Sequence, residues 1–203
     1  MKKIIFGVFV IALILSSFKP RPSVASINSS LDIVTEKKVS DRANAIKNFV
    51  EKTTSYNTDI AFLIDMKIMS GKNRFFIYNL KTNTIIDQGL VAHGLGSETE
   101  TLGQLKFSNI PNSFCTSIGK YAIGKSYVGE FGKAYKLFGL ESTNNNAFQR
   151  NIVLHKYDKM PYEEQTSPIC QSLGCPMVNE AFYKRIEKFI DNSKSKIILE
   201  IYY

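Results

Sequence analysis

The sequence predicts a mainly β protein with flanking helices. Segments rich in Ile, Phe, Val and Tyr recur from residue 60 onward, which is the composition of β-strands. Two stretches, near residue 45 and near residue 185, instead repeat their apolar residues at helical spacing. With 203 residues, 44% of them hydrophobic, the chain is long enough for one sizeable core.

The composition excludes several classes of protein. A mean hydropathy of −0.10 excludes a multi-span membrane protein, and three cysteines exclude a disulfide-dense scaffold. The net charge is +8, but residues 1–25 hold four basic and no acidic residues; without them, 22 Lys and Arg stand against 18 Asp and Glu, or +4. This mild excess suits a polyanionic envelope surface. No dense Lys/Arg stripe is interleaved with aromatics, so we expect no nucleic-acid partner.

Residues 1–25 have the features of a signal peptide. Two lysines follow Met1, residues 4–15 are apolar apart from one glycine, and Ser23-Val24-Ala25 offers small residues before a cut. The apolar run is shorter than the ~20 residues of a spanning helix. We expect an extracytoplasmic protein, in the periplasm or at the cell surface, without a membrane span after cleavage; an uncleaved anchor is the alternative.

Residues 26–59 are predicted to hold a linker and an N-terminal helix. The polar, Ser-rich stretch 26–40 is expected to be loose, and the helix to run over 41–54 from a start at Ser40 and Asp41. Residues 60–203 form the predicted catalytic domain. Its expected strands are 60–68, 74–80, 84–92, 120–128, 135–138, 151–155 and 196–203, with a turn at 81–83, an irregular segment over 94–119, and a helix capped by Asn179.

The chemistry concentrates in residues 150–176. His155 ends a short apolar strand, and Ser172-Leu173-Gly174-Cys175-Pro176 follows. A thiol nucleophile needs a base that forms the thiolate, and histidine suits this near neutral pH. Gly174 permits a tight turn that would aim backbone amides at an oxyanion. The alternative, from spacing alone, is a buried thiol and an unrelated histidine.

These residues resemble the L,D-transpeptidase catalytic domain, the YkuD-type fold. In that family a histidine is followed, after about fourteen to seventeen residues, by Ser/Thr-His-Gly-Cys; here sixteen residues separate His155 from Ser172. Leu173 replaces the second histidine, as in a divergent branch with Ser-x-Gly-Cys-Pro. Other matching segments are Val91-Ala92-His93-Gly94, Phe107-Ser108-Asn109, Ser117-Ile118-Gly119-Lys120-Tyr121, Tyr127-Val128-Gly129, Gly139-Leu140-Glu141 and the stretch from Asn145 to Arg150.

The resemblance implies a cysteine acyltransferase that acts on peptidoglycan stem peptides. Cys175 would attack the carbonyl of the diamino acid before a terminal D-alanine, and the resulting thioester would pass to an amine of a second stem. His155 would exchange the protons, the amides of Gly174 and Cys175 would stabilise the oxyanion, and Ser172 would hold the turn or orient the histidine. No metal or organic cofactor is implied. The alternatives are an L,D-carboxypeptidase of the same fold and a non-catalytic cell-wall-binding module.

Five further residues are candidates for substrate binding. His93 is a structural hydrogen-bonding residue or part of a substrate pocket. Arg150, expected on the strand face opposite His155, pairs with a stem carboxylate or with a structural partner. Tyr121, Tyr127 and Ser117 are candidates for lining the cleft.

Two further points concern the other cysteines and Leu173. Cys115 and Cys170 form a disulfide or stay free, and a Cys170–Cys175 bond is a third possibility. Leu173, beside the tight turn, is expected to pack against a neighbour and to shape the cleft without taking part in the chemistry.

Overall fold

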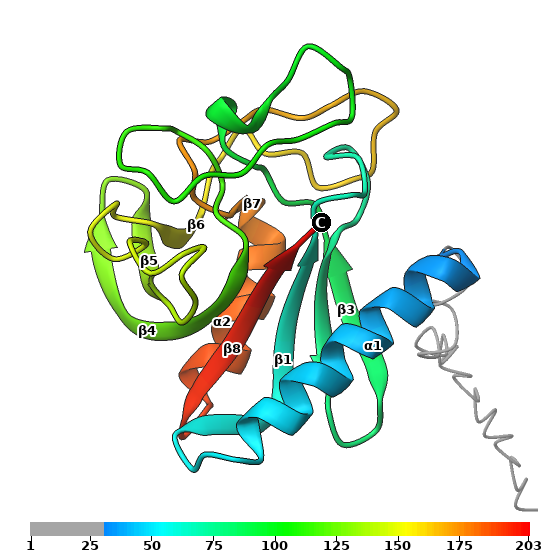
Figure 1. Cartoon of the computed structure of the whole chain (residues 1–203), viewed down its shortest axis with the longest axis vertical. Helices are drawn as coiled ribbons and strands as arrows, with labels where there is room; N and C mark the ends of the chain where they lie inside the picture. The colour runs from blue at the N-terminus through cyan, green and yellow to red at the C-terminus, as the bar shows by residue number, and fades with distance from the viewer. Residues whose placement is uncertain (1–30) are drawn as a thin grey trace, which may run out of the picture.

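The computed structural model describes residues 31–203, whose centre is one eight-stranded sheet (Figure 1). The strands lie in the order β3-β2-β1-β8-β4-β5-β6-β7. The β1–β8 and β6–β7 pairs are parallel, and all other neighbours are antiparallel. This sheet confirms the mainly β class. The predicted signal peptide, residues 1–25, lies outside the described part of the chain.

Every predicted strand has a counterpart, and the helix after Asn179 is present. The strands are β1 (Tyr56–Asp65), β2 (Phe75–Asn79), β3 (Thr84–Gly89), β4 (Gly119–Gly129), β5 (Gly132–Gly139), β6 (Val153–Lys156), β7 (Met177–Val178) and β8 (Lys196–Tyr202). The helices are α1 (Ile33–Val50), α2 (Glu180–Asp191) and the short 3-10 helix η3 (Leu95–Ser97). Within residues 31–203, no helix is both long and apolar enough to cross a membrane.

Helix α1 begins at Ile33, inside the stretch 26–40 that was expected to be a loose linker. The Asp32 side chain caps it by accepting a hydrogen bond of 2.8 Å from the amide of Thr35. Val39 is fully buried, one turn before the apolar residues that revealed the rest of the helix. The linker prediction is therefore wrong from Ile33 onward, because a polar composition concealed a capped helix with a short apolar stripe.

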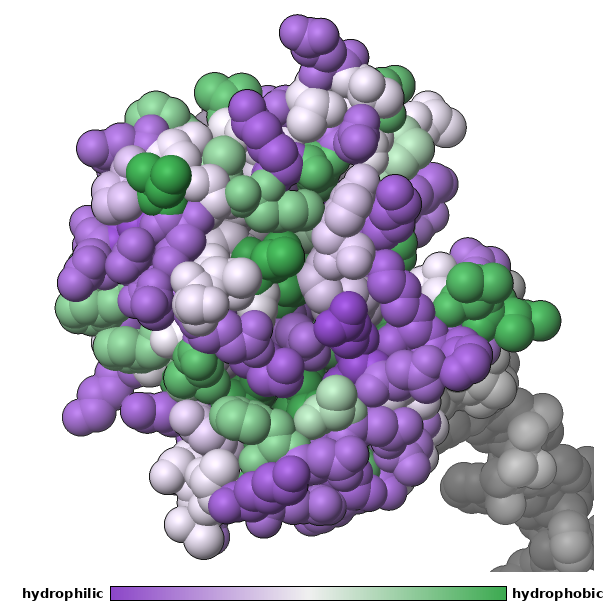
Figure 2. Space-filling model, in the orientation of Figure 1, coloured by the Kyte–Doolittle hydropathy of each residue, from purple (hydrophilic) through white to green (hydrophobic). Residues whose placement is uncertain are grey.

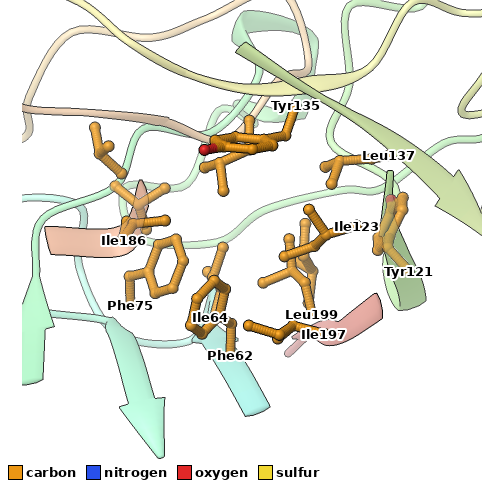
Figure 3. Close-up of a cluster of buried hydrophobic side chains, with 14 of the residues drawn as sticks. Phe62, Ile64, Phe75, Tyr121, Ile123, Tyr135, Leu137, Ile186, Ile197 and Leu199 are labelled. Carbon is orange, nitrogen blue, oxygen red and sulfur yellow. The ribbon is translucent and has the colours of Figure 1, made fainter. Parts of the chain in front are cut away.

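The two long helices cover opposite faces of the sheet. Ala61 and Leu63 of β1 share a buried cluster with the apolar face of α1. Phe62 and Ile64, which alternate with them, belong to the larger cluster that includes Ile186 of α2 (Figure 3). Fully burying each such side chain contributes about 1.5–3 kcal/mol. β1 is therefore apolar on both faces and anchors the centre of the fold.

Local chemistry fixes the ends of other elements. Asn179 caps α2 by accepting a hydrogen bond of 2.7 Å from the amide of Ala181, as the sequence predicts. Asn83, in the predicted turn between β2 and β3, has a φ of 53°. On the face that carries α1, hydrophilic and hydrophobic groups are mixed, and one hydrophobic patch lies at the start of α1, where Ile33 and Val34 are exposed (Figure 2).

Candidate active site

A cleft of about 800 Å³ opens beside strands β6 and β7. Five of the predicted site residues line it: Cys175, His155, Ser172, Arg150 and Tyr127. The other residues that line the cleft are Pro111, Asn112, Phe114, Glu130, Phe131, Gln149, Asn151, Val153, Tyr157, Gln171, Leu173 and Met177.

The sheet register places the thiol and the imidazole on one face. His155 of β6 pairs with Met177 of β7, two residues after Cys175. The amide of Val153 lies 3.4 Å from Cys175 Sγ. Because side chains alternate along a strand, Val153 and His155 share the face that lines the cleft. Among the described residues, no hydrogen bond joins Cys175 Sγ to His155 directly; the backbone carbonyl of Asn151 lies 3.7 Å from the sulfur.

The ring of His155 is held with one nitrogen available as a base. Its Nδ1 donates a hydrogen bond of 2.9 Å to the carbonyl oxygen of Lys156, so Nε2 keeps the lone pair. The ring of Phe131 stacks on the imidazole, with 4.7 Å between ring centroids and 24° between planes. Burial lowers the pKa of His155, which favours the neutral imidazole that a general base requires.

Cys175 is half-buried, and its surroundings act on the thiol in opposite directions. Burial raises the pKa of Cys175, while the Val153 amide and the positive charges of Arg150 and Lys136 oppose that rise. The raised thiol pKa and the lowered imidazole pKa together favour a neutral thiol and a neutral histidine before substrate arrives.

Ser172 closes the turn that presents the cysteine. Its Oγ donates a hydrogen bond of 2.7 Å to the carbonyl of Cys175 and accepts one of 3.1 Å from the amide of Gly174. Gly174 has a φ of +114°, and a Cβ there would lie 2.8 Å from the carbonyl oxygen of Cys115. The Gly174 amide thus donates within the turn, and its expected oxyanion role stays a prediction. Among the described residues, the Cys175 amide has no acceptor.

His93 contacts the turn that carries Cys175 and does not line the cleft. Arg74 Nη2 donates to its Nδ1 over 2.8 Å, so Nε2 carries the proton and donates to Glu98 Oε1 over 2.6 Å. The carbonyl of His93 accepts a hydrogen bond of 2.8 Å from the amide of Ser172. Glu98 Oε1 also accepts one of 3.1 Å from Gln171, which lines the cleft. This geometry favours the structural alternative for His93.

Arg150 lies in the turn before β6, so its expected place on the opposite face of that strand is wrong. Its guanidinium donates to the carbonyls of Ser108 (2.9 Å) and Cys115 (2.6 Å) and to Ser117 Oγ (3.2 Å). These bonds favour its structural alternative, since they tie the long irregular segment to the site.

Two predicted cleft residues are buried away from the cleft. Ser117 Oγ and Tyr121 Oη lie 2.7 Å apart, neither lines the cleft, and burial raises the pKa of Tyr121 to about 12. Tyr127 alone of the three candidates reaches it. Leu173 does line the cleft, but its side chain is 66% exposed, so the expectation that it packs against a neighbour is wrong.

All three cysteines are free thiols. Cys115 Sγ donates a hydrogen bond of 3.0 Å to the carbonyl of Gly96, and Cys170 Sγ lies 3.4 Å from Met160 Sδ. Of the three possibilities left open by the sequence, the structure contains neither disulfide.

Two residues near the site escaped the sequence analysis. Phe131, in the hairpin between β4 and β5, covers the imidazole, and Lys136 of β5 pairs with Val153. Lys136 lies within the predicted strand 135–138, but its pairing with Val153 joins two segments that no local pattern connects. Phe131 lies outside every predicted strand, and we found no pattern that marks it.

Comparison with known proteins places these observations in a family. A model described as the L,D-transpeptidase catalytic domain matches residues 31–199, which is most of the chain. No curated protein matches.

Several solved structures are similar at low identity. The helical cell shape determining protein Pgp2 from Campylobacter jejuni is 12% identical, with a TM-score of 0.44, and the match covers 70% of this chain and 47% of that one. An L,D-transpeptidase from Xylanimonas cellulosilytica is 14% identical, with a TM-score of 0.38 and coverage of 71% and 60%. An L,D-transpeptidase from Mycobacterium smegmatis is 8% identical, with a TM-score of 0.41 and coverage of 71% and 59%.

The chain spans about half to three fifths of the length of these solved chains. The family match covers residues 31–199, which include both the turn that carries Cys175 and the strand that carries His155. By that match, the chain belongs to the L,D-transpeptidase catalytic domain family.

Proposed function

We propose that the protein is an L,D-transpeptidase that transfers acyl groups between peptidoglycan stem peptides through a thioester on Cys175. The observation that carries the proposal is the β6–β7 pairing, which sets Cys175 and His155 on one face of one cleft. The substrate class comes from the family to which the chain belongs. The proposal includes export of the protein and action outside the cytoplasm, where peptidoglycan lies.

In the first half-reaction, His155 Nε2 takes the thiol proton as Cys175 Sγ attacks the carbonyl of the residue before the terminal D-alanine. The free amide of Cys175 stabilises the oxyanion that forms. The C–N bond then breaks, the imidazolium returns its proton to the leaving amine, and D-alanine departs. The donor stem remains as a thioester on Cys175.

In the second half-reaction, an amine of another stem attacks the thioester. His155 accepts a proton from that amine and returns it to the departing Cys175 thiolate, so the enzyme regains its starting state. The thioester keeps the donor acyl group activated, so the second transfer needs neither a separate energy source nor a cofactor.

Product mass tests the proposal. Purified tetrapeptide stems incubated with the protein are expected to yield a cross-linked dimer and free D-alanine. The Cys175→Ala variant should yield neither, whereas Cys170→Ala should retain most of the turnover. Trimmed monomer without dimer would support the carboxypeptidase instead, and unchanged stems with every variant would contradict an enzymatic role.

A further inference from the structure

Lys136 does not line the cleft itself, but it contacts two residues that do, Val153 and Tyr127. It pairs across β5 and β6 with Val153, whose amide contacts Cys175 Sγ, so Val153 lies between the lysine and the cysteine. Its neighbour Tyr135 pairs with the core residue Leu154, which places Lys136 on the opposite face, the one that lines the cleft.

Aromatic rings hold the Lys136 ammonium without neutralising it. Nζ lies 4.6 Å from the ring centroid of Tyr127, which lines the cleft, and 5.7 Å from that of Phe148. Such cation–π contacts fix the position of a cation and leave its charge intact. The charge also acts on Cys175, since it lowers the pKa of that thiol against the effect of burial.

Other cations around the site already have partners. Arg150 donates to the carbonyls and hydroxyl described above, Lys156 Nζ lies 3.0 Å from Glu180 Oε1, and Lys133 pairs with Asp191. Within residues 31–203, Lys136 forms no ion pair with a carboxylate. Lys136 therefore has its hydrogen-bonding capacity available for an anionic ligand.

We propose that Lys136 binds the free terminal carboxylate of the donor stem and so selects stems that end in a free acid. This rests on the proposed function, in which the scissile carbonyl lies at Cys175 and the carboxylate follows one residue later. β5 and β7 are two strand spacings apart, roughly 10 Å. Tyr127, whose ring holds the Lys136 ammonium, lines the same cleft as Cys175, so a carboxylate one residue beyond the sulfur lies toward that ammonium.

Binding to the Cys175→Ala variant tests the proposal without turnover. Titration calorimetry would compare a tetrapeptide stem that ends in a free acid with the same stem as a C-terminal amide. The free acid should bind about tenfold to a hundredfold more tightly, the scale of a hydrogen bond to a charged group. Adding Lys136→Gln should remove that difference and change the affinity for the amide less than twofold, whereas Lys136→Arg should preserve most of the preference.

Lys196→Gln is the matched control. Its ammonium lies 5.7 Å from the ring centroid of Phe138, which stacks on Phe148. Neither Lys196 nor Phe138 lines the cleft. This variant loses one charge and one cation–π contact and should keep the preference for the free acid.

Three outcomes would overturn the carboxylate site: equal binding of acid and amide, no binding of either, or a Lys136→Gln variant that loses affinity for both equally. Failure of the proposed function is a separate result, because it would show as absent acylation in the protein that retains Cys175. A preference for the acid that depends on Lys136 would still stand in that case.

Discussion

The backbone amide of Val153 lies 3.4 Å from Cys175 Sγ, so the strand that carries His155 also contacts the sulfur. Two residues along β6, His155 presents its ring on the same face. The relative positions of the two groups therefore depend on the pairing of β6 with β7 and on the turn that carries Cys175 just before β7.

Removing the imidazole should slow the first acyl transfer without unfolding the protein. For His155→Ala we expect the acylation rate to fall by about 10²- to 10⁴-fold, the usual range for a positioned general base. Single-turnover kinetics with a tetrapeptide stem would measure it, and circular dichroism would check the fold. A rate within tenfold of the unaltered protein would show that another group takes the thiol proton.

The thiol should be less reactive before substrate binds than an exposed cysteine. Burial raises the pKa of Cys175, so the thiolate fraction at neutral pH is lower than in the unfolded chain. Alkylation by iodoacetamide, followed by peptide mass at Cys175, should give a pH midpoint above that measured in urea. A midpoint below the unfolded value would indicate a resting thiolate–imidazolium pair instead.

His93 should contribute to stability and have little direct part in catalysis. His93→Ala removes the partner of Arg74 and Glu98 and should cost about 1–3 kcal/mol of unfolding free energy. Burial, and then the charge of Arg74, lowers the pKa of His93 in the folded state. The unfolded chain therefore binds a proton below about pH 6.5 that the folded chain refuses, and stability falls as the pH falls through that range.

Urea denaturation at pH 7.5 and pH 5.5 would test the role of His93. The loss of stability between the two values should be smaller in His93→Ala, although not absent, since burial lowers the pKa of His155 in the same direction. An unchanged loss in the variant, or a fall in acylation rate as large as that of His155→Ala, would contradict the structural role.

Leu173 should affect substrate more than stability. Because its side chain is 66% exposed, Leu173→Ala should change the free energy of unfolding by less than about 0.5 kcal/mol. Its place on the cleft lining predicts a change in KM. Leu173→His should leave the pH–rate profile with its original limbs. A new limb with a tenfold faster turnover would show that the absent histidine limits this enzyme.

Local patterns in the sequence predicted most of the sheet, because β1, β2 and β8 carry continuous runs of Ile, Phe and Leu that are buried on both faces. β7 was missed because it has only two residues and exists through its pairing with β6. The start of α1 was missed because Asp32 and Val39 are isolated features within a polar stretch.

In the candidate site, too, the features set by neighbours in sequence were predicted, and those set by tertiary contacts were not. The motif predicted Cys175 and His155 as a pair, and the turn made by Ser172 follows from neighbours in sequence. Lys136 lies opposite Val153, whose amide contacts Cys175 Sγ, because of the register of β5 and β6, which no local pattern encodes. The structural role of His93 likewise depends on Arg74, which precedes β2 and reaches the histidine only in the folded chain.

The mass of the intact protein after brief incubation with a tetrapeptide stem tests the central claim most directly. The account predicts an increase equal to the stem without its terminal D-alanine, located by fragmentation on the peptide that contains Cys175. The same treatment should add no mass to Cys175→Ala. An adduct on Cys115 or Cys170, or turnover of stems by Cys175→Ala, would contradict the assignment of Cys175 as the nucleophile.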